Sequence, residues 1–511
     1  MMLSNLELYI LLAIPAAVAW LSVYLYRQYK RLSHIPGPRS AGFSKWWFVK
    51  ATLSGQTHLD LYQVCEKYGQ IARIGPNDVV TCDIDLIRRM LSVRSQYTRS
   101  AWYNGMRFEP HKNNIVSMRD DATHAIMRSR MAAGYSGKDV DDLEQKIDTG
   151  VLNLLGLLDS YAKENRIFDF ARKVQYLAVD VVTDLIFGET FGDLTSDADV
   201  NGFLGAMERF IPTLIVSTVL PWIIPLLGMP LFRPLIPSEH DVLGVGRIMG
   251  IAKRVVSERY GDEKKTSRDM LGSFVARGLT QEQAECEIAA SIIAGSDTTA
   301  TAIRSTMLYI MTNPRVLSSL QHEIQSSSSS SSLQHETQSS DSDSSLPLPP
   351  ITPYAHLRTM PYLQAVIKEG LRMHPPAASP MSKQVPPDGD NWNGIAFPPG
   401  TRISLCLWGV FRSRALWGND ADEFRPERWL EVGPEKRAEM DAVWDVLFSA
   451  GKWACLGRNV AHIEMSKTIV ELLRRFDFSV VDPTRPWKSI NCGVFLQSEM
   501  WVRARRRGGA M

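Results

Sequence analysis

The chain opens with an uninterrupted apolar run. Residues 8–26 contain no charged side chain, and Arg27, Lys30 and Arg31 follow directly. A membrane-spanning helix needs about 20 apolar residues, and basic residues on one flank mark the cytoplasmic side. A cleaved signal peptide is the alternative, but it would carry a basic segment before the apolar run. We therefore predict a single-pass anchor in residues 1–31, with the remaining chain in the cytoplasm.

Beyond residue 32, most apolar positions recur with the period of amphipathic helices. The longest such segment covers residues 280–313, where Thr280 and Gln283 form a capping-box pattern and Pro314 marks the end. Further helices are expected over residues 58–68, 124–136, 168–191, 362–373 and 459–475. Short strand-like runs occur at residues 71–74 and 78–82, and residues 394–405 are typical of a hairpin. We predict a mainly α fold with small β-sheets, of the α+β class.

Two stretches depart from this pattern. Residues 210–232 carry no charge, but four prolines between Pro212 and Pro230 interrupt them too often for one straight membrane helix. We expect an interfacial element that dips into a membrane. Residues 318–350 are rich in serine and contain a duplicated Leu-Gln-His-Glu segment. Because such a composition cannot bury a core, we predict a disordered insertion within a single domain of residues 32–511.

Composition narrows the class of protein without identifying it. The hydrophobic share of 45% and the charged share of 22% are those of a globular protein. A net charge of +2 gives no indication of nucleic-acid binding. The six cysteines are scattered and form no CxxC pair. Their spacing favours a reducing compartment and argues against structural zinc.

One cysteine lies in a glycine-rich loop directly before a predicted helix. In residues 448–458, Cys455 stands between Gly451, which permits a turn at positive φ, and Gly457, which removes a side chain where the helix starts. A thiolate at a helix N-terminus is stabilised by the dipole and the free N–H groups. This arrangement suits a single axial thiolate on a metal. Taken alone, the loop would more often be an ordinary buried cysteine in a tight turn.

Other motifs decide between these two interpretations. The pattern Phe-x-x-Gly-x-x-x-Cys-x-Gly, starting at Phe448, resembles the haem-binding loop of the cytochrome P-450 superfamily. Residues 294–299 (Ala-Gly-Ser-Asp-Thr-Thr) resemble the family's oxygen-binding motif. Glu369-x-x-Arg372, followed by residues 424–429, resembles its buried Glu–Arg–Arg network. All occur in the family's order over residues 32–511, and the details are similar to fungal members, nearest to the pisatin-demethylase-like branch.

The resemblance implies haem b as the cofactor, with Cys455 as the axial thiolate and the only protein ligand to iron. Phe448, Gly451 and Gly457 would then shape the loop around it. Donors to the haem propionates are implied at three positions, namely His124, Arg128 and Lys383. The sequence departs from the family at Trp453, where Arg or His is usual, and indole offers an N–H but no charge. His124, Arg128 and Lys383 would then hold the propionates between them.

The resemblance also assigns residues to catalysis and to the core. Asp297 and Thr298 would organise proton delivery to bound oxygen. Glu369, Arg372 and Arg428 would form a buried network that locks the core beside the haem, since a buried charge pair must be fully hydrogen-bonded. The pocket walls implied are Trp102, Tyr103 and residues 210–235, 292–298, 377–381 and 494–495.

The implied activity is that of a haem-thiolate monooxygenase, which inserts one oxygen atom from dioxygen into a small hydrophobic substrate of fungal secondary metabolism. Its partners would be NADPH-cytochrome reductase and membrane lipid, at the endoplasmic reticulum membrane. A haem-thiolate isomerase or dehydratase is an alternative, which would show no NADPH dependence. A non-catalytic haem-binding membrane protein is another, which would show no substrate-dependent NADPH use. No nucleic-acid partner is expected.

Overall fold

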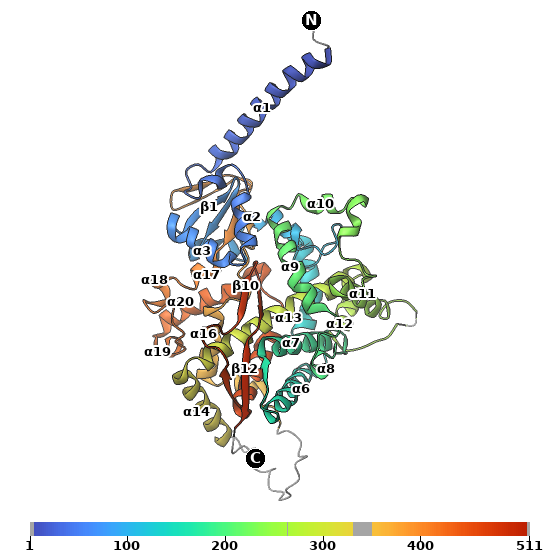
Figure 1. The fold of residues 1–511 in the computed structure, drawn as a ribbon, viewed down its shortest axis with the longest axis vertical. Coiled ribbons are helices and arrows are strands. Elements are labelled where there is room, and N and C mark those ends of the chain that lie inside the picture. Colours follow the sequence, from blue (N-terminus) through green and yellow to red (C-terminus); the bar gives the residue numbers. More distant parts are fainter. Residues whose placement is uncertain (1–4, 263, 331–349, 508–511) are drawn as a thin grey trace, which may run out of the picture.

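The computed structural model describes residues 5–262, 264–330 and 350–507. Helices make up 58% and strands 10% of the chain, which confirms the predicted mainly α fold with small sheets. Figure 1 shows α1 projecting from one end of the body, next to a small β-rich part that contains β1, α2 and α3. The helical part lies beside and below it, with α13 running through the middle.

The helices before the central one are α1 (Asn5–Arg31), α2 (Trp46–Leu53), α3 (Thr57–Tyr68), α4 (Ile84–Leu91), α5 (Asp121–Tyr135), α6 (Leu143–Lys163), α7 (Phe170–Phe187), α8 (Asp193–Ser196), α9 (Phe203–Val219), α10 (Ile223–Leu227), α11 (Gly244–Ser257) and α12 (Met270–Ala276). From the central helix onward they are α13 (Gln281–Met311), α14 (Pro314–Ser330), α15 (Tyr354–Leu357), α16 (Pro361–Met373), α17 (Leu407–Val410), α18 (Arg414–Trp417), α19 (Arg428–Glu431), α20 (Pro434–Trp444) and α21 (Arg458–Arg475). Short 3-10 turns are η1 (Arg39–Gly42), η2 (Ala101–Met106), η3 (Pro230–Leu235), η5 (Asp445–Phe448) and η6 (Gly451–Trp453).

The strands form small sheets around the helical core. The largest sheet has the order β1-β2-β8-β5-β3, and a three-stranded sheet has the order β4-β12-β9. Two further pairs are β10 with β11 and β6 with β7. The strands are β1 (Ile71–Gly75), β2 (Asp78–Thr81), β3 (Thr98–Arg99), β4 (Ile167–Asp169), β5 (Lys383–Gln384), β6 (Asp390–Trp392), β7 (Ile395–Phe397), β8 (Arg402–Leu405), β9 (Phe476–Val480), β10 (Lys488–Asn491), β11 (Phe495–Ser498) and β12 (Trp501–Arg506).

The predicted hairpin over residues 394–405 is wrong in its pairing. β7 pairs with the preceding β6, whereas β8 leaves this hairpin and runs parallel to β2. Pro398 and Pro399 cannot donate to a strand ladder, so β7 ends before them. Arg402 then donates to the Asp78 carboxylate at 2.6 Å, which helps to hold β8 against β2.

α13 is the axis around which the helical part is built. Its predicted capping box is present, with Thr280 and Gln283 bonded in both directions. Residues 294–299 remain regular α-helix, although Gly295, Asp297 and two consecutive threonines are poor helix formers. The Thr298 hydroxyl does bond back to the Ala294 carbonyl at 2.9 Å. Packing against α7 and α11 keeps this stretch helical despite its poor propensity.

α1 is a single helix that includes Pro15. Its last turn docks on the body, because Arg73 donates to the carbonyl oxygens of Gln28 and Tyr29, each at 3.0 Å. Within residues 5–262, 264–330 and 350–507, no helix combines the length and apolar character that a membrane span requires. The predicted anchor is thus not confirmed by the structure.

The serine-rich segment is partly helical, which corrects its predicted start at residue 318. α14 continues to Ser330, while residues 331–349 lie outside the described part. Val316, Leu320 and Ile324 recur every four residues and are buried. The Glu323 carboxylate accepts the backbone N–H groups of Tyr362 and Leu363 at the start of α16, both at 2.8 Å.

Leu320→Ala should therefore destabilise the protein, although the residue sits in a serine-rich stretch. The side chain is completely buried, and removing such a side chain costs about 2–5 kcal/mol. Ser318→Ala, on the exposed face of the same helix, should change the free energy of unfolding by less than about 0.5 kcal/mol. Denaturant titration of both variants measures the difference. Equal stabilities would show that α14 contributes nothing to the core.

Candidate functional site

The Cys455 loop joins η6 to α21. The backbone N–H of Cys455 donates to the Phe448 carbonyl at 2.8 Å, which closes the loop. Although Cys455 is exposed on one side, desolvation by the protein around the loop raises the pKa of its thiol, and the N–H groups of Gly457 and Arg458 and the charge of Arg128 oppose this shift. Cys455 is exposed, whereas the other five cysteines are buried or half-buried. Its sulfur therefore faces an opening at the N-terminus of α21.

The surroundings constrain the two loop glycines to different degrees. Gly451 has φ +61°, and a Cβ there would lie 2.3 Å from the Leu91 carbonyl oxygen, so no other residue fits. At Gly457, a Cβ would lie 4.0 Å from the Cys455 sulfur and from the Tyr135 ring, where it would narrow the space beside the thiol. Phe448 packs its ring against Trp444 and His462, at centroid distances of 5.6 and 5.3 Å. The predicted loop residues are thus assembled around one sulfur.

The three predicted propionate donors are also brought together. Arg128 donates to the Ala454 carbonyl, directly beside the cysteine. Lys383 is buried; its Nζ donates to the Tyr103 hydroxyl at 2.9 Å and lies 3.9 Å from the centre of the Trp453 ring. His124 is buried as well, and burial together with the charges of Arg99 and Arg128 lowers its pKa to about 4.

This cluster has an excess of positive charge. Burial, and then the charge of Arg99, hold the pKa of Lys383 well below its usual value. Lys452 pairs with Asp121 at 2.6 Å, but within the described residues no carboxylate pairs with Lys383. Burying a cation without a partner is costly. The cluster therefore suits a ligand that brings carboxylates of its own.

Sequence reasoning missed one indole donor in this cluster, that of Trp102, whereas the N–H of Trp453 was noted without being given a role. The indole N–H groups of Trp102 and Trp453 are buried and lack a hydrogen-bond partner among the described residues. Trp102 packs edge-on against Tyr103, at 4.9 Å between ring centres, which places it beside Lys383. The Arg99 guanidinium lies over the Tyr103 ring, 4.9 Å from the ring centre. The signal available was the aromatic pair Trp102-Tyr103, which was assigned only to the pocket wall.

The middle of α13 opens on one side, although the helix is otherwise buried. Ala294 is exposed and Thr298 is half-buried one turn later, so both lie on the same face. Tyr135 of α5 bonds to Ser291 of this helix at 2.7 Å, and its ring approaches Gly457. This contact joins α13 to the cysteine loop. Ser291, which makes this contact, lies about one turn before the open stretch of α13.

Asp297 lies on a flank of α13 that is turned toward α7 rather than into that opening. One carboxylate oxygen accepts the Gln175 amide at 2.7 Å, and Arg304 donates to the same Gln175. The other oxygen is buried without a partner among the described residues. Burial raises the pKa of Asp297 to about 6, against the opposing charge of Arg304. A small cavity adjoins this carboxylate and is also lined by Arg172 and Glu208, which form an ion pair at 2.7 Å.

The Glu369 network is complete. Its carboxylate accepts two bonds from Arg372, both at 2.9 Å, and one from Arg428 at 2.8 Å. The Trp429 indole donates at 2.9 Å and the Arg425 backbone N–H at 3.0 Å. All three members of the predicted network are buried. The geometry locks α16 to the segment around α19.

The family model for cytochrome P450 matches residues 36–500. The chain belongs to the cytochrome P450 family. A cytochrome P450 monooxygenase named ABA1 from Pyricularia oryzae is 37% identical over 507 residues, covering 96% of each chain. One named aba1 from Botryotinia fuckeliana is 36% identical, covering 94% of this chain and 92% of its own. Pisatin demethylase from Fusarium vanettenii is 27% identical, covering 92% of this chain and 90% of its own.

Family membership establishes the chemistry. The protein is a P450 monooxygenase that binds haem b through a cysteine thiolate and uses a redox partner, dioxygen and a substrate. The observed residues fit this cofactor. A sulfur faces an open space beside Gly457, and the cationic cluster with its two unpaired indole N–H groups suits the two propionates. In the described part of this P450, no group of three or more His, Cys, Asp or Glu residues could hold a metal ion.

Several segments predicted to wall the P450 pocket converge. A Cβ on Gly493 would lie 3.2 Å from Ser379 and 3.4 Å from Ile215 of α9, so three distant segments meet there. The Tyr103 hydroxyl donates to the Met381 carbonyl at 3.2 Å, which adds the η2 segment to the same wall. The walls named from the sequence thus come from neighbouring parts of the structure.

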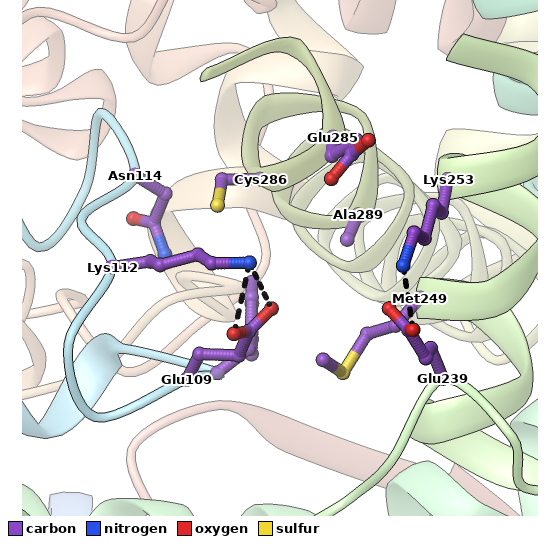
Figure 2. A pocket seen from close by; sticks show the side chains of 10 residues that line it. Glu109, Lys112, Asn114, Glu239, Met249, Lys253, Glu285, Cys286 and Ala289 are labelled. Atoms are coloured by element: carbon purple, nitrogen blue, oxygen red, sulfur yellow. Dashed lines mark hydrogen bonds and ion pairs between the residues drawn. The ribbon is translucent and has the colours of Figure 1, made fainter. Parts of the chain in front are cut away.

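A second pocket opens beside the outer part of α13 (Figure 2). Ion pairs line it, Lys112 with Glu109 at 3.0 Å and Lys253 with Glu239 at 2.6 Å, and Ala289 of α13 forms part of its wall. At about 1.5 Å per residue, Ala289 precedes Thr298 by about 13 Å along the helix. This polar pocket is therefore separate from the open face around Thr298.

Proposed function

We propose that the Cys455 thiolate would hold the haem iron, and that the chain hydroxylates a small hydrophobic metabolite bound beside Ala294 and Thr298. The observation that carries this proposal is the exposed thiol at the N-terminus of α21, joined through Tyr135 to α13 about one turn before its open stretch. Bound haem supplies the activation of dioxygen, and the thiolate donates electron density to it. The protein contributes the ligand, the pocket and the proton path.

His124, Arg128 and Lys383 are proposed to hold the propionates. The excess of buried positive charge supports this role, since two carboxylates would neutralise it. Trp453 then takes the place of the usual cation by offering its indole N–H, and Trp102 offers a second one. Lys383 binds as a point charge rather than as a bidentate fork.

Asp297 and Thr298 are proposed to deliver protons to the distal site. Thr298 stands on the open face, and its hydroxyl can rotate away from the Ala294 carbonyl to donate elsewhere. Asp297 has a pKa of about 6, which allows it to take and release protons near neutral pH. The cavity beside Asp297 is also lined by the half-exposed pair Arg172 and Glu208. It offers a route by which protons from solvent can return to the Asp297 carboxylate.

Thr298→Ala should retain haem and much of the NADPH consumption while losing product. Because positioned proton transfer contributes about 10²–10⁴-fold in rate, we expect product per NADPH to fall by about tenfold, with a matching rise in hydrogen peroxide. Thr312→Ala is the control, since Thr312 lies at the end of the same helix and its hydroxyl makes the same back-bond, to Leu308 at 2.8 Å. If Thr298→Ala forms as much product per NADPH as the wild type, the Thr298 hydroxyl has only a structural role.

The direct test of the function uses membranes that contain the protein, NADPH-cytochrome reductase and a fungal metabolite extract. Incubation with NADPH under ¹⁸O₂ should yield a product that has gained one labelled oxygen, and no such product should form without the reductase. A product formed without NADPH and dioxygen would instead establish the isomerase or dehydratase. The pocket and the fungal relatives support a hydrophobic secondary metabolite as the substrate.

We further propose that the P450 is held at the endoplasmic reticulum membrane by α1, with its catalytic body in the cytoplasm. Ile14, Trp20 and Val23 on α1 are between 51% and 68% exposed. Beyond α9, Trp222 and Leu231 are 63% and 81% exposed. Figure 1 shows α10 at the same end of the body as α1, so one bilayer can contact both.

Removing residues 1–26 should weaken membrane binding without abolishing it, because residues 27–31 stay docked through Arg73 and the α10 region remains. Adding Trp222→Glu and Leu231→Glu should then abolish the remaining binding. In a flotation assay with vesicles, this variant should stay in the dense bottom fraction. Trp501→Glu, an exposed aromatic on β12, is the control and should leave binding unchanged. Full release by the truncation alone would exclude a role for the α10 region.

A further inference from the structure

Three of the six cysteines, far apart in the sequence, meet in the structure. Cys65 lies in α3, Cys82 directly follows β2 and Cys406 directly follows β8. Parallel pairing of β2 with β8 brings the last two together, and the Cys406 N–H donates to the Thr81 carbonyl at 2.8 Å. The Cys82 N–H donates to the carbonyl of Gln70, just beyond the end of α3, at 3.0 Å. We call Cys65, Cys82 and Cys406 the three-thiol cluster.

The side chains of the three-thiol cluster are in contact. Cys65 and Cys406 belong to one small buried apolar cluster, and Cys82 packs against it. A Cβ on Gly409 would lie 3.0 Å from the Cβ of Cys82 and 3.3 Å from the sulfur of Cys406, so both face the same point of the backbone. Cys65 and Cys406 are 3% and 2% exposed, whereas Cys82 is half-buried. Cys82 is therefore the member that solvent can reach.

We propose that the three-thiol cluster is an oxidation site, at which hydrogen peroxide converts Cys82 to a sulfenic acid and Cys65 then closes a disulfide with it. A reactive cysteine of this kind is solvent-accessible, has thiolate character and stands next to a resolving thiol. Cys82 is the half-buried member of the cluster and packs beside the buried Cys65 thiol. The inference rests on the three-thiol cluster alone and is independent of the haem site.

The electrostatics of the cluster agree with this order of reaction. The hydrogen bond from Cys65 lowers the pKa of Cys82, and its own backbone N–H acts in the same direction against burial. Hydrogen bonding to its two neighbours and burial raise the pKa of Cys65. Because the thiolate is the nucleophile, Cys82 attacks first and Cys65 remains a thiol until the sulfenic acid forms.

The two steps balance. The Cys82 sulfur attacks one peroxide oxygen, the O–O bond breaks, and the second oxygen leaves as water once it is protonated. The Cys65 sulfur then attacks the sulfenic sulfur, and the hydroxyl departs as a second water with the proton of the Cys65 thiol. Two thiols lose two electrons, and one peroxide is reduced to two waters. The product links α3 to the end of β2.

Cys286 provides a matched comparison within the same chain. It is also half-buried, but no cysteine neighbours it, and burial raises its pKa to about 12. It should therefore react with peroxide at least about tenfold more slowly than Cys82, since reactivity follows thiolate character. Cys406 touches Cys65, so Cys406→Ser tests whether the third thiol is needed.

The experiment treats the reduced holoenzyme with a small molar excess of hydrogen peroxide. Remaining thiols are then alkylated with iodoacetamide, and the peptides are identified by mass spectrometry. We expect a linked Cys65–Cys82 peptide that has lost two hydrogens, retained in Cys406→Ser. In Cys65→Ser, dimedone should label Cys82 as the sulfenic acid. The Soret band of the reduced carbon monoxide complex checks that each sample is folded.

Two results would overturn the proposal. One is oxidation of Cys82 no faster than Cys286 in the wild-type protein. The other is a disulfide between Cys82 and Cys406 in the presence of Cys65, which would reassign the resolving thiol. Should Cys65→Ser fail to fold, the linked peptide in wild type and in Cys406→Ser decides the question without it.

Discussion

Cys455→Ser is expected to abolish the strongly red-shifted Soret band of the reduced carbon monoxide complex. Serine matches the shape of cysteine, so the loop closed by the bond between the Cys455 N–H and the Phe448 carbonyl should persist. A hydroxyl cannot supply the thiolate electron density on which that band depends. Product formation should be lost together with the band. Absorption spectra of the purified variant measure the change directly.

The control for this variant is Cys286→Ser, on the outer part of α13. Cys286 is half-buried and lies on a helix that also carries Thr298, but it lines the separate polar pocket. Its spectrum and activity should equal those of the wild-type protein. A red-shifted band that survives in folded Cys455→Ser would transfer the ligand role to another cysteine, and the remaining cysteines could then be replaced in turn.

The Cys455 loop was predictable because its chemistry is local. The spacing of Phe448, Gly451, Cys455 and Gly457 encodes the turn and the helix start within a few residues, and the structure assembles them as expected. The Glu369 network was predictable for a different reason, since the resemblance supplied the distant Arg428. Without the resemblance, helical spacing indicates only that Glu369 and Arg372 form an i, i+3 pair.

Contacts made only by the tertiary fold could not be predicted. The indoles of Trp102 and Trp453 meet around Lys383 because η2, β5 and η6 come together in space, and no local pattern signals this. The three-thiol cluster arises in the same way, from the parallel pairing of β2 with β8. In the sequence these cysteines are scattered and form no CxxC pair, so nothing there indicates that they meet. Which side chains meet follows from their burial and contacts in the folded protein, and residue type alone does not reveal it.

The start of the disordered insertion was wrongly placed within α14, because the segment was judged by its overall composition. Serine dominates the segment and hides Val316, Leu320 and Ile324, which form one apolar stripe at i, i+4 and i+8. A test of periodicity over residues 314–325 would have found the helix. The error at β8 has another origin, because its partner β2 lies more than 300 residues earlier in the sequence and is chosen by packing and by the bond from Arg402 to Asp78.

Glu369→Gln should be among the most destabilising single substitutions in this P450. Glutamine preserves the volume but removes the charge that two buried arginines share, Arg372 at 0% and Arg428 at 3% exposure. The amide nitrogen of glutamine is a donor, whereas the carboxylate oxygen it replaces is an acceptor. It would face either those guanidinium groups or the Trp429 indole N–H, and all of these groups are donors themselves. Breaking a buried ion pair costs about 3–5 kcal/mol. That is a large share of the about 5–15 kcal/mol that stabilises a typical folded domain.

The expected result is a large drop in the denaturant midpoint, accompanied by loss of haem as the core beside the cysteine loop loosens. Glu439→Gln is the matched control, because Glu439 pairs with Lys436 at 2.8 Å on exposed α20 and its side chain is 54% exposed. Exposed pairs contribute about 0–1 kcal/mol, so that variant should unfold like the wild type. If Glu369→Gln also unfolds like the wild type and keeps its haem, the two arginines are sufficiently stabilised by their backbone acceptors. These are Phe411 and Ala421 for Arg372 and Trp417 for Arg428, at 2.6–2.7 Å.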